Sequence, residues 1–136
     1  MRRLIVAFVE TRTNRNSVVA LSGALETSPH QERIDVLFDR SGDPERLLSL
    51  VAGAPRAVIA LSFLTADLPQ VAHTLADLRQ RTASANPRPL LLAGGPHASA
   101  LPNEVLSLGA DVVVRGEAEI SFPRLLEALL RDEPVD

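Results

Sequence analysis

Five short apolar segments alternate along the chain with longer segments that carry apolar residues at helical spacing. Leu4–Val9 and Ala57–Leu61 are apolar throughout, which is typical of a strand that is covered on both faces. Arg33–Asp39 alternates with polar residues, so we expect it at the edge of a sheet. The predicted strands are Leu4–Val9, Arg33–Asp39, Ala57–Leu61, Pro89–Ala93 and Asp111–Val114.

Capping residues and apolar spacing predict a helix after each strand. Ser17 is a cap for the first helix, Asp43 followed by Pro44 begins the second, and Asp67 or Thr65 caps the third. Gly109 ends the fourth helix. The predicted helices are Val18–Thr27, Glu45–Ala52, Leu68–Arg81, Pro102–Leu108 and Ile120–Arg131.

This order of elements predicts an α/β fold. Strands that alternate with helices of this length form a parallel sheet with right-handed crossovers. We therefore expect one domain over residues 1–136, a three-layer, doubly wound, five-stranded parallel sheet of the flavodoxin-like or Rossmann-like kind. The predicted strand order is 2-1-3-4-5.

Composition excludes several classes of function. The net charge is −3 and aromatic residues make up 3%, so neither a basic surface nor stacking rings favour nucleic-acid binding. The chain has no Cys and no Lys, which excludes zinc–thiolate sites, iron–sulfur clusters and Schiff-base chemistry within it. The apolar run at the N-terminus ends at Glu10, too early for a secretion signal, and no run is long enough to span a membrane. We expect a cytoplasmic protein with no membrane partner.

The candidate site lies at the carboxyl ends of the strands, where open parallel sheets bind ligands. The unusual residues gather in the loops after the third, fourth and fifth strands. They are Ser62 and Thr65, then Gly94, Gly95, Pro96 and His97, then Arg115, Gly116 and Glu117. Each also has a structural interpretation: a Gly-Gly-Pro tight turn, a helix cap at Thr65, or a serine that satisfies a strand-end carbonyl. No two of the three histidines have metal-ligand spacing, so we expect no metal site and no catalytic residue here.

Two of these motifs together are similar to cobalamin-binding domains of the methionine synthase and mutase type. That family carries Asp-x-His-x-x-Gly after its first strand, Ser-x-Leu after its third and Gly-Gly after its fourth. Ser62-Phe63-Leu64 matches the second element, and Gly94-Gly95 matches the third after a gap of about 29 residues. The first element is absent, because Arg15, Ser17 and Ala20 occupy its Asp, His and Gly positions.

The cobalamin-binding domains of cobalamin-dependent radical SAM enzymes resemble the chain more closely, and they commonly lack that histidine. They often read Gly-Gly-Pro-His-Ala after strand four and Val-x-Arg-Gly-Glu-x-Glu after strand five. The corresponding segments here are Gly94-Gly95-Pro96-His97-Ala98 and Val113-Val114-Arg115-Gly116-Glu117-Ala118-Glu119. The match is strongest from Pro89 to Leu130.

This resemblance implies a cobalamin-binding domain that holds its cofactor base-off without a histidine ligand, in the N-terminal part of a radical SAM methyltransferase or related enzyme. The iron–sulfur cluster and S-adenosylmethionine would belong to a radical SAM barrel supplied in cis or in trans, so the chain alone has no complete active site. The residues that the resemblance assigns to the cofactor are Ser62, Leu64, Thr65, Gly94, Gly95, Pro96, His97, Arg115, Gly116 and Glu117.

Other functions for the same fold fit the sequence less well. A receiver domain needs an Asp after the third strand and a Lys after the fifth, but the third strand ends in Ser62 and the chain has no Lys. A flavin-binding loop or a G-x-G-x-x-G nucleotide motif needs glycine after the first strand, where 10–16 has none. A stand-alone Rossmann-like binding or interaction module without cobalamin is the remaining alternative.

Overall fold

The computed structural model describes residues 4–9, 23, 34–52, 54, 56–63, 67–83, 88–94, 100–114 and 118–130. The strands are β1 (Leu4–Val9), β2 (Ile34–Asp39), β3 (Arg56–Ser62), β4 (Leu90–Gly94) and β5 (Val112–Val113). The helices are α2 (Pro44–Val51), α3 (Leu68–Thr82), α5 (Pro102–Leu108) and α6 (Ala118–Leu130). The first predicted helix, over 18–27, lies outside the described residues apart from Gly23, which is helical.

The strands form one parallel sheet with the order β2-β1-β3-β4-β5. The predicted α/β class and strand order are therefore confirmed, including the edge position of β2 and the central position of β3. Because all strands are parallel, their carboxyl ends lie along one edge of the sheet. The loops that follow β1, β2, β3, β4 and β5 therefore begin at that edge.

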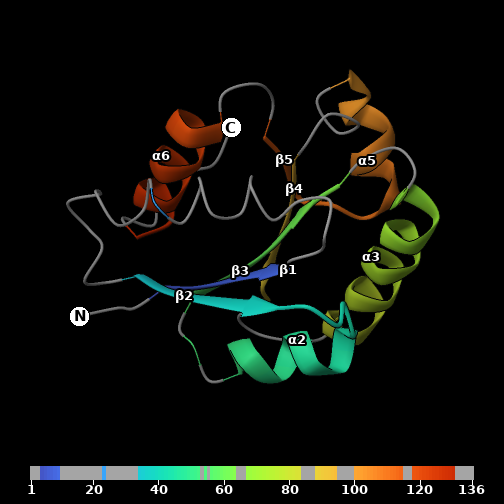
Figure 1. Cartoon of the computed structure of the whole chain (residues 1–136), viewed down its shortest axis with the longest axis horizontal. Helices are drawn as coiled ribbons and strands as arrows, with labels where there is room; N and C mark the ends of the chain where they lie inside the picture. Colours follow the sequence, from blue (N-terminus) through green and yellow to red (C-terminus); the bar gives the residue numbers. More distant parts are fainter. Residues whose placement is uncertain are drawn as a thin grey trace.

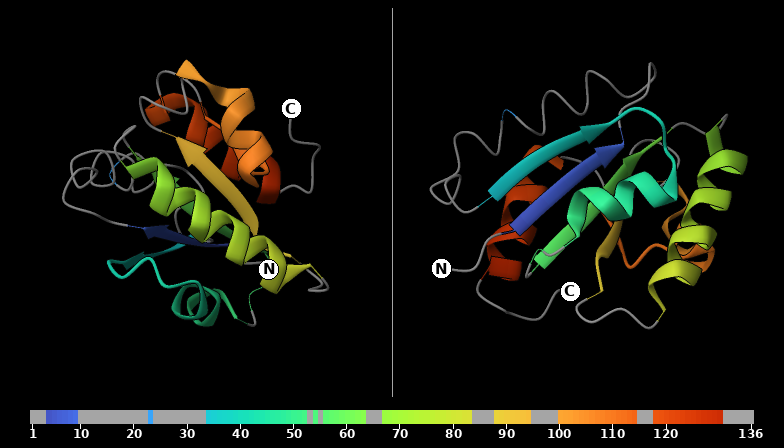
Figure 2. Two further views of the ribbon diagram at one scale, coloured as in Figure 1. Left: turned by 90° about the vertical axis from the view of Figure 1, so that its right-hand side faces the viewer. Right: turned by 90° about the horizontal axis from the view of Figure 1, so that it is seen from below.

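Helices cover both faces of the sheet, which makes three layers (Figures 1 and 2). Leu4, Val6 and Phe8 of β1 pack with Phe122 and Leu126 of α6 in one apolar cluster. The alternate residues of β1 join a second cluster, which contains Leu47 of α2, Leu75 of α3 and Val105 of α5. Central strands thus bury both of their faces, as the unbroken apolar runs predicted.

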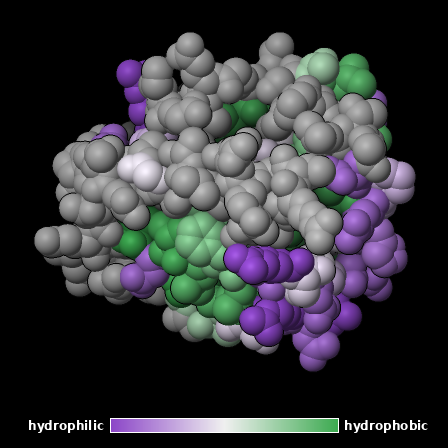
Figure 3. Space-filling model, in the orientation of Figure 1, coloured by the Kyte–Doolittle hydropathy of each residue, from purple (hydrophilic) through white to green (hydrophobic). Residues whose placement is uncertain are grey.

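The edge strand β2 carries much of the exposed apolar surface on one side of the molecule. Phe38 is 46% exposed and stacks on the buried Phe8 of β1, with ring centroids 5.9 Å apart. Figure 3 shows apolar residues gathered over β2, with strongly polar residues beside them. None of the described helices is long and apolar enough to span a lipid bilayer.

Among the described helix ends, the predicted cap of α2 and the predicted end of α5 at Gly109 are confirmed, and the predicted cap of α3 at Asp67 is not. The side chain of Asp43 accepts a hydrogen bond from the N–H of Glu45 and caps α2, with Pro44 in the first turn as predicted. Asp67 occupies the N-cap position of α3, but its side chain makes no capping hydrogen bond. Its backbone is helical (φ −87°, ψ −5°), whereas a capping residue has extended geometry, so the predicted cap at Asp67 is wrong. Thr65, the alternative cap, lies outside the described residues.

Candidate functional site

The structure brings Ser62 and Gly94 side by side at the carboxyl edge of the sheet. They are register partners at the ends of the adjacent strands β3 and β4. The N–H of Phe63 donates to the carbonyl of Gly94 over 3.3 Å, so the two strand ends stay paired to the last residue. Ser62 and Gly94 lie 32 positions apart in the sequence, and the sheet brings them together at the ends of neighbouring strands.

Side-chain alternation assigns both residues to the face of the sheet that α6 covers. Leu61, Phe63 and Ala93 pack in the cluster on the opposite face. Successive residues of a strand point to opposite faces, so the Cβ of Ser62 and the missing Cβ of Gly94 belong to the α6 face. Ser62 is partly exposed there.

Gly94 is not required by the described backbone. The described glycines with positive φ are Gly42 and Gly109, so Gly94 has a conformation that any residue adopts. Among the described residues, a Cβ built on Gly94 would meet the carbonyl oxygen of Val114 at 3.8 Å, which is ordinary van der Waals contact. Within the described part of the chain, a side chain at this position would meet no clash, as expected where a bulky ligand approaches the backbone.

The third predicted motif begins at the same edge. The N–H of Val114, directly before Arg115, donates to the carbonyl of Ala93 over 2.9 Å. Val114 thus lies beside the end of β4 and next to Gly94. The other predicted site residues lie outside the described residues: Leu64, Thr65, Gly95, Pro96, His97, Arg115, Gly116 and Glu117.

A pocket of about 70 Å³ opens at the crevice between the ends of β1 and β3. This is the switch point of the sheet: β2 is added on one side of β1, and β3, β4 and β5 are added on the other side. Val9, Leu61, Phe63 and Val71 give the pocket apolar walls. Its polar lining comes from the β2–α2 turn, from the end of β3 and from the start of α3: Arg40, Ser41, Gly42, Ser62, Asp67, Gln70 and Thr74. The pocket lies towards α2 and α3, whereas Gly94 faces α6.

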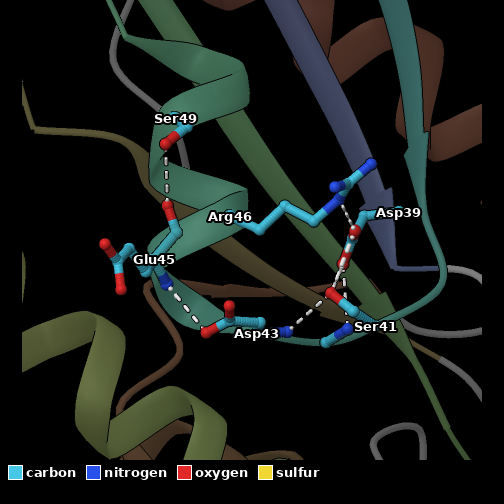
Figure 4. Close-up of polar contacts among 7 residues, drawn as sticks. Asp39, Ser41, Asp43, Glu45, Arg46 and Ser49 are labelled. Atoms are coloured by element: carbon cyan, nitrogen blue, oxygen red, sulfur yellow. Dashed lines mark hydrogen bonds and ion pairs between the residues drawn. The ribbon is translucent and has the colours of Figure 1, made fainter.

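The β2–α2 turn, one wall of this pocket, is fixed by a buried carboxylate. The side chain of Asp39 is 1% exposed. It accepts hydrogen bonds from the Ser41 hydroxyl, from the N–H of Gly42 at 2.8 Å and from Nε of Arg46 at 2.9 Å (Figure 4). Sequence reasoning missed this role. The signal was an Asp at a strand end followed by Ser-Gly-Asp, which favours a side-chain-to-backbone turn.

The described part of the site contains no metal-binding constellation. No group of three His, Cys, Asp or Glu side chains that could hold a metal ion occurs among the described residues. His73, the described histidine, is exposed on α3 and does not line the pocket. His30 and His97 lie outside the described residues.

Known proteins are similar to this chain in part of its sequence and in its fold. Over 44 residues the chain is 46% identical to "Uncharacterized methyltransferase sll1242" of Synechocystis sp. (strain ATCC 27184 / PCC 6803 / Kazusa), a match that covers 32% of this chain and 8% of that protein. The structure superimposes on rubredoxin oxygen:oxidoreductase from Desulfovibrio gigas with a TM-score of 0.51 and 15% identity. That match covers 95% of this chain and 38% of the other, and it shows a shared flavodoxin-like fold.

The chain spans less than a tenth of the methyltransferase and less than half of the oxidoreductase. The family model for the B12 binding domain matches residues 2–126, which is nearly the whole chain. The matched segment includes both strand ends that carry Ser62 and Gly94 and the switch-point crevice between β1 and β3. The chain therefore belongs to the B12-binding domain family.

Proposed function

We propose that this domain holds cobalamin, base-off and without a histidine ligand, for a cobalamin-dependent radical SAM methyltransferase or a related enzyme. Family membership supports the cofactor, and the similarity to the Synechocystis methyltransferase supports the methyltransferase assignment. The main support for the cofactor site is that Ser62 and Gly94 are register partners at the carboxyl edge of the sheet, where open parallel sheets bind ligands. A Cβ at Gly94 would clash with no described residue, so a ligand group can come close to the backbone there.

In this proposal the backbone at Gly94 and Gly95 lets the nucleotide tail of cobalamin approach closely. Ser62 and Thr65 donate hydrogen bonds to polar groups of the cofactor, with Leu64 between them. His97, after the rigid Pro96, hydrogen-bonds the tail or the neighbouring backbone. Arg115, Gly116 and Glu117 order the loop after β5. The bound cofactor supplies the organometallic chemistry, and the protein sets its position and its axial environment.

Histidine independence rests on the positions that a ligand would occupy. Arg15, Ser17 and Ala20 stand where the classical motif has Asp, His and Gly. His73 is exposed on α3, outside the pocket between β1 and β3. We therefore propose that no side chain of this domain provides nitrogen to the lower face of cobalt.

The rest of the enzyme lies in a partner domain. The chain has no Cys, so it cannot hold the iron–sulfur cluster of a radical SAM enzyme. We propose that a radical SAM barrel, in cis or in trans, provides the cluster and S-adenosylmethionine and faces the carboxyl edge of the sheet. No catalytic residue is assigned to this chain.

The test is retention of cobalamin by the purified chain. The protein is mixed with hydroxocobalamin, desalted, and its visible spectrum recorded; the bound cofactor is then reduced to cob(II)alamin and examined by EPR. Retained cofactor without nitrogen superhyperfine splitting is expected. Splitting would show that a histidine or the tail base ligates cobalt and would overturn histidine independence. A folded chain that retains no cobalamin would instead be a stand-alone binding or interaction module.

A further inference from the structure

The hydroxyl of Thr74 lines the switch-point pocket and has no structural role in the described part of the fold. Thr74 lies on the second turn of α3, is 7% exposed and lines the pocket. Within the described part of the chain its hydroxyl makes no hydrogen bond. The side chain is largely buried while its hydroxyl is open to the pocket, so the hydroxyl can bond a ligand group or a water molecule there.

Thr82, on the same helix, shows what a structural threonine does here. It is 2% exposed, and its hydroxyl donates to the carbonyl of Leu78, one turn earlier, at 2.7 Å. Thr74 has the same helical environment and makes no such bond to Gln70. No fully buried side-chain oxygen or nitrogen of the described residues lacks a partner, so the hydroxyl of Thr74 keeps access to the pocket.

The rest of the pocket suits a short arm with an apolar stem and a polar end that both donates and accepts hydrogen bonds. Val9, Leu61, Phe63 and Val71 would contact methylene groups. The amide of Gln70 and the hydroxyl of Thr74 can each donate and accept, and the charged side chains of Arg40 and Asp67 also line the pocket. The volume of about 70 Å³ is enough for such an arm.

We propose that the pocket receives one of the carboxamide arms of the corrin ring, with Thr74 hydrogen-bonded to its amide. The inference rests on the proposed cobalamin site. A primary amide both donates and accepts, which matches the mixed donors and acceptors of the polar lining, and its methylene stem matches the apolar walls. The domain would then hold cobalamin at two places: the tail beside Gly94 on the α6 face, and an arm at the switch point on the α3 face.

Cobinamide, which has the corrin and its amide arms but lacks the nucleotide tail, separates the two places. Binding of dicyanocobinamide and of cyanocobalamin is measured by equilibrium dialysis on the whole chain. Thr74→Val keeps the side-chain shape and removes the hydroxyl. It should raise the dissociation constants of both ligands by the same factor, about threefold to tenfold for one hydrogen bond. Thr74→Ser, which keeps the hydroxyl, should bind both nearly as the parent chain does.

Thr82→Val is the matched control, because it removes a buried hydroxyl from the same helix away from the pocket. It should leave both affinities unchanged, and melting curves confirm that each variant is folded. Equal binding by Thr74→Val and the parent chain would overturn the arm pocket, as would a loss confined to cyanocobalamin or a failure of cobinamide to bind. A parent chain that binds neither ligand would instead refute the proposed function.

Discussion

Gly94 and Gly109 lack a side chain for different reasons. Gly109 ends α5 with φ +127°, and a Cβ there would lie 3.0 Å from Cγ of Arg79. The fold requires glycine here, because any other residue would strain the backbone at this φ and its Cβ would crowd Arg79. Gly94 has neither constraint within the described residues, and we propose that its glycine lets a ligand approach the edge of the sheet.

The two alanine variants should therefore separate stability from binding. Gly94→Ala should change the free energy of unfolding by less than about 1 kcal/mol. A methyl group in a close approach costs about 1–3 kcal/mol, so the same variant should weaken cobalamin binding by about tenfold. Urea unfolding and equilibrium dialysis measure the two quantities.

Gly109→Ala is the control and should show the reverse. It should lower the free energy of unfolding by about 1–3 kcal/mol because of its positive φ. Its affinity for cobalamin, measured where the protein is fully folded, should be unchanged. Unchanged cobalamin binding by a folded Gly94→Ala variant would mean that no ligand group approaches this glycine.

At the scale of elements, Asp111 connects three segments at the amino edge of the sheet. Its carboxylate accepts hydrogen bonds from Arg79 of α3 at 2.5 Å, from Arg88 at 3.2 Å and from the N–H of Leu91 in β4 at 2.8 Å. Both arginine side chains are about 40% exposed, so solvent screens these ion pairs. The partly buried bond to the backbone of β4 is therefore the main contribution.

Removal of this carboxylate should destabilise the chain without affecting the ligand site. Asp111→Ala leaves the N–H of Leu91 without its acceptor, and we expect a loss of about 1–3 kcal/mol in the free energy of unfolding. Asp77→Ala is the matched control. Asp77 raises the pKa of Arg81 through a hydrogen bond and its charge, but the two side chains are solvent-exposed neighbours on α3. A similar effect of both variants in urea unfolding would contradict the role assigned to Asp111.

The elements were predictable where local chemistry decides them. The bounds of β1 and α5 agree with the prediction to the residue. An unbroken apolar run marks β1, and α5 begins at Pro102 and ends before Gly109. β5 is shorter than predicted, Val112–Val113 in place of Asp111–Val114, because it pairs with β4 at only two positions. The side chain of Asp111 is used to bind Arg79 and Leu91, which a sequence pattern does not reveal.

The candidate site was predictable only in part, for a related reason. Parallel topology alone places Ser62 beside Gly94, since both end adjacent strands. The carboxylate of Asp39 and the free hydroxyl of Thr74 depend on how the β2–α2 turn and α3 pack against β3. In the sequence Thr74 and Thr82 are two threonines of one helix, and only tertiary contacts distinguish them.

At the scale of the whole molecule, cobalamin should act as a stabiliser of the folded chain. The proposed contacts come from β1, β3, β4 and α3, which are distant in the sequence and meet only in the folded state. A ligand that binds the folded state alone adds RT ln(1 + [L]/Kd) to the free energy of unfolding.

At a cyanocobalamin concentration 100 times the dissociation constant, the free energy of unfolding measured in urea should therefore be about 2.7 kcal/mol higher than for the free chain. The gain should rise with the logarithm of the ligand concentration. Cobinamide at the same multiple of its own dissociation constant should give the same increment, because the relation depends only on occupancy of the folded state. An increment well below this value would mean that the unfolded chain also binds the ligand, for example through its histidines, and that the contacts do not require the assembled edge of the sheet.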